Sequence, residues 1–148
     1  MNKEFQIFTI GFTQKSAELF FTTLAKSGVK LVIDTRLNNV SQLAGFTKKT
    51  DLKYFLKTIA DIDYIHIQDL APTKDILDSY KKKKIDWETY EQKFVQLMVD
   101  RRIENKFSKE QLDGGCFLCS EAKPHYCHRR LVAEYFQQKL GNLRIKHL

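Results

Sequence analysis

The feature that most constrains the fold is a predicted strand at residues 29–34 with a continuous apolar core at 31–33, because it follows closely after a helical pattern. Residues 5–10 alternate and are rich in β-forming side chains, so they predict a strand that ends at Gly11. Residues 16–27 carry apolar side chains at helical spacing, and Gly28 is a typical stop signal. A continuous apolar strand is typical of a parallel sheet that is covered on both faces. The order strand, helix, strand therefore predicts a βαβ unit with a right-handed crossover.

The rest of the chain continues this alternation of helices and strands. We find no internal repeat, low-complexity segment or composition shift that marks a domain boundary. Thr50-Asp51 and Thr73 are expected to cap helices, and the last strand is expected at an edge of the sheet. The sequence therefore predicts one α/β domain over residues 1–148, with a mostly parallel sheet and flanking helices in a Rossmann-like, three-layer arrangement. The expected helices cover 52–60, 74–80, 87–102 and 131–140, and the expected strands cover 64–67, 116–119 and 143–147.

Composition excludes several classes of protein. Hydrophobic residues make up 43% of the chain, enough to bury a core, so global disorder is disfavoured. No apolar stretch approaches the ~20 residues that a membrane span needs. The three cysteines are an odd number, and the chain opens without an apolar signal region. These observations predict a reduced, cytoplasmic protein in which a disulfide scaffold is disfavoured.

The formal net charge of +7 indicates an anionic partner, and nucleic acid is the leading candidate. The run of four lysines at 81–84 supplies four of these charges. Such runs are often simply solvated, so contact with nucleic acid and a solubilising role both remain open. We expect no membrane partner, and the sequence does not predict an oligomeric state.

Residues just after the predicted strands carry polar and reactive side chains. In open parallel sheets, ligands bind beyond the carboxyl ends of the strands. We therefore expect these residues, distant in sequence, to share one edge of the sheet. They are Gly11 and Thr13 after the first strand, Asp34 and Arg36 after the second, and Cys119 and Glu121 after the fourth.

Two adjacent arginines, Arg129 and Arg130, precede the last predicted helix. Cations in the first turn of a helix oppose the positive end of its dipole, at a cost of about 0.3–1 kcal/mol each. Free N–H groups at the same end bind anions. Either a bound carboxylate or phosphate, or an internal carboxylate from Asp34 or Glu121, therefore neutralises the pair.

The cysteines allow more than one interpretation. Cys119 is a candidate nucleophile, with a pKa lowered by the helix N-terminus and by Arg129. A buried cysteine at a strand end is, however, also a common small core residue. Cys116 and Cys119, with Cys127 and His128, also have the chemistry of zinc ligands. However, strand positions three apart point to opposite faces, so we predict no metal site and no cofactor.

A pattern of six residues joins the fourth strand to the last helix: Cys-x-Glu-x-x-Pro-x-x-Cys-His-Arg. With it, the chain resembles the family known as domain of unknown function 488 over nearly its whole length. The resemblance also rests on a first strand that ends in Gly and a second strand that ends in Asp-x-Arg, followed by Ser and Phe. The residues that carry it are Thr9-Ile10-Gly11, Asp34-Thr35-Arg36, Ser41, Phe46, and then Cys119, Glu121, Pro124, Cys127, His128 and Arg129.

The sequence departs from the family pattern in its loops. Phe12-Thr13 stands where members often have His-Ser, and Asn39-Val40 stands where they commonly have a proline before the serine. Asp69-Leu70-Ala71 replaces a Leu-Gly-Gly after the third strand. The resemblance therefore implies the fold and the position of a site, whereas the family name implies no activity.

The sequence leaves two functions open. One is an enzyme that acts on a nucleic acid or nucleotide-like substrate; the other is a non-catalytic nucleic-acid-binding or interaction module, in which the same residues form a structural network. In the enzyme, Cys119 would attack, Glu121 or Asp34 would move a proton, and His128 completes the catalytic set. Arg36 and Arg129 would hold the anion. The remaining substrate-binding candidates are Gly11, Thr13, Ser41 and Cys127.

Overall fold

The computed structural model describes residues 4–38, 45–121 and 124–148. Its centre is one five-stranded sheet, in which every neighbouring pair of strands is parallel. The predicted α/β class is thus confirmed. Along the sheet the strands follow the order β3-β2-β4-β1-β5. Their bounds are β1 Phe5–Gly11, β2 Leu31–Asp34, β3 Asp63–His66, β4 Gly115–Cys119 and β5 Leu143–His147.

The three central strands end at the same level of the sheet. Gly11 at the end of β1 pairs with Cys119 at the end of β4, and Asp34 at the end of β2 pairs with Leu118. β5 pairs with β1 at the outside of the sheet, which confirms the predicted edge strand. Because all strands run the same way, their carboxyl ends form one continuous edge.

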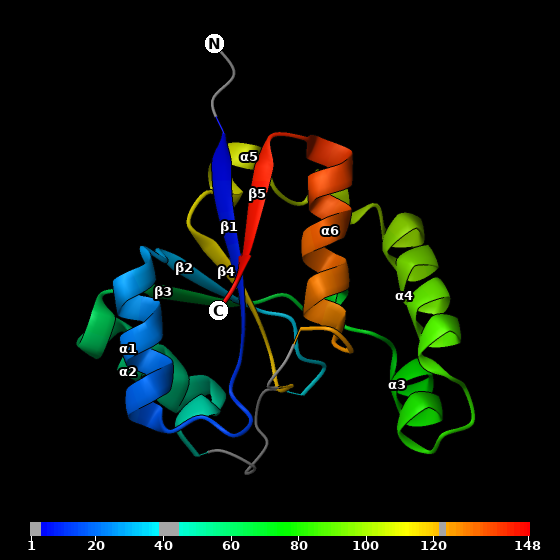
Figure 1. Cartoon of the computed structure of the whole chain (residues 1–148), viewed down its shortest axis with the longest axis horizontal. Coiled ribbons are helices and arrows are strands. Elements are labelled where there is room, and N and C mark those ends of the chain that lie inside the picture. Colours follow the sequence, from blue (N-terminus) through cyan, green and yellow to red (C-terminus); the bar gives the residue numbers. More distant parts are fainter. Residues whose placement is uncertain (1–3, 39–44, 122–123) are drawn as a thin grey trace.

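Helices cover both faces of this sheet, which gives three layers (Figure 1). On one face, α1 and α2 bury Phe20, Leu24 and Leu56 against strand residues such as Val32. The other face packs mainly against α4 and α6. The helices are α1 Ala17–Ser27, α2 Lys49–Ala60, α3 Lys74–Lys81, α4 Trp87–Arg101, α5 Lys109–Leu112 and α6 His128–Leu140. None of the helices in the described ranges combines the length and apolar character that crossing a bilayer requires.

Local signals explain several helix ends. The Ser16 hydroxyl accepts a hydrogen bond from the Leu19 N–H at the start of α1, and Gly28 ends the helix at φ 85°. Thr73 caps α3 as predicted. The predicted cap of α2 is wrong, because the helix begins at Lys49 and places Thr50-Asp51 inside its first turn.

The last helix begins earlier than the apolar periodicity predicted. Cys127 is the N-cap residue of α6, and His128 is its first helical residue. The shift matters for the site, because it puts His128 and Arg129 directly beside the carboxyl edge of the sheet. The apolar pattern starts only at Leu131, since the preceding residues face the site and not the core between helices.

Candidate functional site

Backbone hydrogen bonds join the loops at the carboxyl edge. The Thr13 N–H donates to the Ser120 carbonyl at 2.9 Å, and the Thr35 N–H donates to the Leu118 carbonyl at 3.0 Å. At Gly11 the approach is too close for any side chain. A Cβ atom there would overlap the carbonyl oxygen of Glu121 and lie 2.6 Å from Nη1 of Arg129. The glycine at the end of β1 is therefore required by close packing.

Asp34 and Arg36 form a buried ion pair at the end of β2. Arg36 Nε and Nη2 donate to the two carboxylate oxygens of Asp34, and the Tyr64 hydroxyl donates to Asp34 Oδ2 at 2.6 Å. Arg36 Nη2 also donates to the Thr47 carbonyl, and the guanidinium lies 5.3 Å from the centre of the Phe12 ring. Arg36 Nη1 is buried and has no hydrogen-bond partner among the described residues. Asp34 thus holds Arg36 in place, while one end of its guanidinium is left without a hydrogen-bond partner among the described residues.

Arg129 is fully buried behind the motif. Its Nη1 donates to Cys119 Sγ at 3.2 Å and to the Glu121 carbonyl at 2.6 Å. Its Nε and Nη2 have no hydrogen-bond partner within the described part of the chain. Loss of solvation lowers the pKa of Arg129 to about 10, so the side chain stays charged at neutral pH.

Arg130 has carboxylate partners of its own. It pairs with Glu134 at 3.0 Å and with Glu91 at 3.6 Å. For Arg129, no ion pair with the Asp34 or Glu121 carboxylate is found among the described residues. An internal carboxylate therefore neutralises only the second arginine of the pair.

Cys119 and Cys127 are joined by a disulfide, which corrects the expectation of a protein without one. The bond joins the last residue of β4 to the N-cap residue of α6, which therefore lie side by side. That proximity depends on the loop conformation, which the cysteine count does not reveal. Cys116 remains a free thiol, buried in the core cluster that packs against α1 and α2, and burial raises its pKa. Its separation from Cys119 agrees with the strand geometry.

His128 is held in one orientation by the end of β2. Its Nε2 lies 2.8 Å from the Thr35 carbonyl oxygen and 3.0 Å from the Thr35 hydroxyl. Since a carbonyl can only accept a hydrogen bond, Nε2 carries the proton and Nδ1 carries the lone pair. Burial lowers the pKa of His128 to about 4, so the ring is neutral at pH 7.

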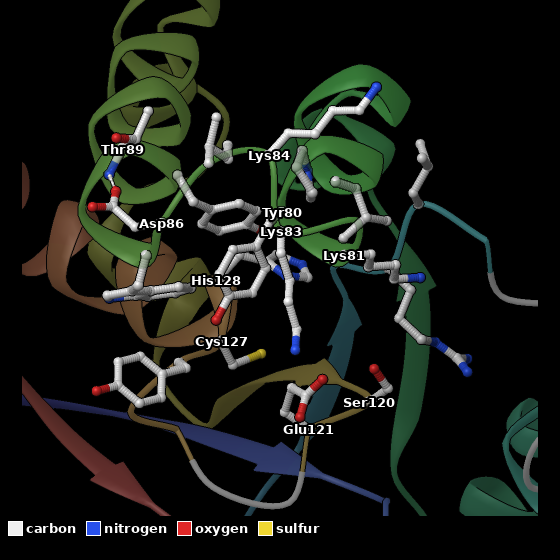
Figure 2. Close-up of a pocket in the computed structure, with 18 of the residues that line it drawn as sticks. Tyr80, Lys81, Lys83, Lys84, Asp86, Thr89, Ser120, Glu121, Cys127 and His128 are labelled. Carbon is white, nitrogen blue, oxygen red and sulfur yellow. Dashed lines mark hydrogen bonds between the residues drawn. The ribbon is translucent and has the colours of Figure 1, made fainter.

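A cavity of about 1040 Å³ opens in front of these residues. Figure 2 shows Lys83 extending into it, above Glu121 and Cys127. The opposite wall comes from α3, α4 and the segment between them. Besides apolar residues and the Asp86 carboxylate, the cavity is lined by the cations Arg36, Lys81, Lys83 and Lys84; the aromatic residues Phe12, Tyr80, Trp87, Tyr90 and Tyr126; and the reactive or polar groups Ser120, Glu121, Cys127 and His128.

The structure brings most of the predicted site residues together. Four of them line the cavity, namely Arg36, Glu121, Cys127 and His128. Asp34, Cys119 and Arg129 contact these four from inside the protein, while Gly11 and Thr13 contribute close packing and a backbone hydrogen bond. Ser41 lies outside the described residues.

Sequence reasoning missed the opposite wall of the cavity. The sequence left the lysine run open between contact with nucleic acid and a solubilising role, and it did not place these lysines or Trp87 beside the motif. Phe94 lies in the core, whereas Tyr90 and Trp87 pack with the core and also line the cavity, as does Lys83. The only signal in the sequence was the proximity of a cationic run to an aromatic residue, a weak indication without the fold.

These features define an α/β protein with a cationic, partly aromatic cavity at the carboxyl edge of a parallel sheet. The chain belongs to the family described as Domain of unknown function DUF488, whose model matches residues 16–136. The matched region contains the whole motif from Cys119 to Arg129, so the resemblance seen in the sequence is confirmed. Neither the curated proteins nor the solved structures contain a match to this chain.

Proposed function

We propose that this protein is an enzyme that acts on an anionic, nucleotide-like substrate in the cavity at the carboxyl edge of the sheet. One observation carries the proposal: cationic, aromatic and reactive side chains from distant segments line the same cavity. Its volume of about 1040 Å³ is at the upper end of the range for small-molecule sites. A phosphate, a base and a reacting bond therefore have separate places to bind.

Arg36 is assigned to the phosphate. Asp34 fixes the guanidinium from behind through Nε and Nη2, whereas Nη1 is left without a described partner. A planar guanidinium that is already oriented binds an oxyanion with little loss of side-chain entropy. The lysines at 81, 83 and 84 add positive charge across the cavity. Asp34 thus acts through Arg36 and not as a proton carrier.

Trp87 and Tyr126 are assigned to the base. Their rings meet edge to face, with centroids 5.4 Å apart, and both line the cavity. Tyr126 is 55% exposed, so one face of this pair is open to a ligand. Stacking of a nucleobase on an aromatic side chain contributes about 1–3 kcal/mol.

Glu121 is assigned to proton transfer. Its side chain is exposed to the cavity, while its backbone carbonyl is fixed by Arg129. His128 is neutral, and its Nδ1 offers a second proton acceptor beside Cys127. Cys119 is the candidate nucleophile once its bond to Cys127 is reduced, and the Arg129 N–H directed at its sulfur would stabilise the thiolate.

The assignment is tested with a panel of nucleoside mono-, di- and triphosphates and single-stranded oligonucleotides, with products detected by mass spectrometry. The reduced wild-type chain is expected to convert at least one of them. Glu121→Gln should lower turnover by about 100-fold or more while binding persists, as expected for loss of an acid–base group. Glu110→Gln, an exposed carboxylate on α5, is the control. Full turnover by Glu121→Gln would remove Glu121 from the mechanism.

A second candidate is a non-catalytic module that binds nucleic acid. The favouring observation is burial: Cys119, Cys127 and Arg129 are each at most 3% exposed, which is typical of a network that fixes α6 to the sheet. Oligonucleotide binding that weakens steeply with salt, without conversion of any substrate, would establish this function. Absence of binding at low salt would eliminate it. Thiol labelling of the reduced, folded chain adds a direct test, since rapid modification of Cys119 indicates an open site.

A further inference from the structure

We propose that the reduced chain binds a zinc ion through Cys119 Sγ, Cys127 Sγ and His128 Nδ1. Among the described residues these three side chains form a cluster of metal-binding type, with their ligand atoms all within 4.8 Å of one another. Cys116, on the other side of the strand, takes no part. The inference concerns metal binding alone and is tested without an activity assay; in the metal-bound chain Cys119 and His128 would be ligands and not the nucleophile and proton acceptor assigned above.

The spacing of the two cysteines fits an ion between them. Their Cα atoms lie 7.4 Å apart, whereas disulfide-bonded cysteines usually have Cα atoms about 4.4–6.8 Å apart. In a tetrahedral zinc site each sulfur lies about 2.3 Å from the ion, so the two sulfurs must separate after reduction. The wide Cα spacing permits this by rotation of the side chains.

The histidine is already in the tautomer that a metal requires. His128 Nε2 donates to the Thr35 carbonyl, which leaves the Nδ1 lone pair free for an ion. The Thr35 hydroxyl donates to the Leu118 carbonyl and is thereby fixed as an additional acceptor for Nε2. Histidines that bind metals generally donate their second N–H to a carbonyl or carboxylate in this way.

The first sulfur is also supported from outside the cluster. Arg129 Nη1 donates to Cys119 Sγ at 3.2 Å, a contact that stabilises a thiolate more than a thiol or a disulfide. The three ligands lie at the end of β4 and at the N-cap and first helical residue of α6. The site is therefore built on positions that the fold holds in place.

The ion would lie at the wall of the cavity. Cys127 and His128 line the cavity, whereas Cys119 and Arg129 are buried behind it. Three protein ligands leave the fourth tetrahedral position open to a water molecule or a substrate oxygen, the arrangement of catalytic and not of structural zinc sites. Reduction of the disulfide by a phosphine and water gives two thiols and a phosphine oxide. Zinc binding then releases one proton from each thiol.

The test uses the full-length chain, reduced with a trialkylphosphine and freed of metal with a chelator. Zinc is titrated against a chromophoric chelator, and cobalt(II) is added as a spectroscopic probe. We expect one ion per chain, with sulfur-to-cobalt charge-transfer absorption and the intense visible bands of tetrahedral cobalt. The same chain with its disulfide intact is the matched control, because it differs in no residue and is expected to bind neither ion at this site.

Variants identify the ligands. Loss of any one ligand is expected to weaken zinc binding by more than about 100-fold, and this is tested with Cys119→Ser, Cys127→Ser and His128→Ala. Removal of a residue that only orients a ligand weakens metal binding less than this. Cys116→Ala and His125→Ala should bind zinc like the wild type, and circular dichroism checks that each variant is folded. Absence of stoichiometric binding by the reduced wild type would overturn the proposal. Equal zinc binding by the oxidised and reduced chains would also overturn the proposal. Both of these measurements use the wild-type chain, so neither is affected if a variant fails to fold.

Discussion

Arg36 and Asp34 face each other in a two-point ion pair, with Nε and Nη2 of the arginine 2.9 and 2.7 Å from the two carboxylate oxygens. The carboxylate is fully buried and the arginine is only 6% exposed. The Arg36 backbone N–H and the Tyr64 hydroxyl also donate hydrogen bonds to the Asp34 carboxylate. The consequence is an arginine whose direction is set by the protein before any ligand arrives.

Asp34→Asn is expected to lower the free energy of unfolding by about 3–5 kcal/mol, because it leaves the buried Arg36 without a countercharge. Urea unfolding at pH 7 measures the effect. Glu4→Gln is the control, since it removes the exposed Glu4–Arg144 pair and should cost less than about 1 kcal/mol. Equal, small losses in both variants would show that the buried pair is not stabilising.

Gly11→Ala is expected to destabilise the protein by about 1–3 kcal/mol, the usual cost of forcing a methyl group into a packed region. The new Cβ would displace the Glu121 carbonyl and Arg129 Nη1. Gly45→Ala is the matched control, because a Cβ there meets no atom of the described residues within 4 Å. Thermal and urea unfolding measure the stability of both variants. If Gly11→Ala were as stable as the wild type, the close contact at Gly11 would be contradicted.

Neutralising the lysines of the cavity wall should weaken the binding of a single-stranded oligonucleotide. Affinity decreases with salt, so the plot of log affinity against log salt has a negative slope. In the triple variant Lys81→Gln, Lys83→Gln, Lys84→Gln this slope should become less steep by about 0.7 for each lysine that contacts a phosphate. A control with the same change in net charge is Lys26→Gln, Lys53→Gln, Lys139→Gln, on surfaces away from the cavity. If both variants lose affinity equally, binding reflects net charge and not the cavity.

Tyr135→Phe should reduce stability in a manner that depends on pH. The Tyr135 hydroxyl, whose pKa burial raises to about 12, donates to Glu104 at 2.6 Å and lowers the pKa of that carboxyl below 4.5. A lowered carboxyl pKa stabilises the folded state above the ordinary pKa, and this contribution is lost as the pH falls through the folded pKa. The loss on substitution should therefore be about 1 kcal/mol at pH 7 and shrink below pH 4.5.

Urea unfolding of wild type and Tyr135→Phe between pH 7 and pH 3 checks this dependence. Tyr54→Phe is the control, because Tyr54 is 64% exposed and its substitution should change little at any pH. A difference between wild type and Tyr135→Phe that stays constant across the range would mean that the hydroxyl acts through packing and not through the carboxylate.

Much of the fold could be predicted because it depends on local pattern. The apolar segment before Asp34, the alternation in residues 5–10 and the glycine after α1 are each readable within a few residues, and they specify the parallel sheet. The start of α6 could not be read in this way. Its first residues, His128 and Arg129, face the site, so they interrupt the apolar periodicity on which helix prediction relies.

The sequence by itself determined the α/β class, the family and the residues that gather at the carboxyl edge, because strand direction and a six-residue motif are contained in the chain order. Only the tertiary structure decided which of these residues meet. Packing of α3 and α4 brings Lys83 and Trp87 to the same cavity as Glu121, and the start of α6 beside the end of β4 brings Cys127 and His128 to Cys119 without Cys116. Such contacts depend on the angles at which helices pack and on loop conformation, which no single segment of sequence encodes.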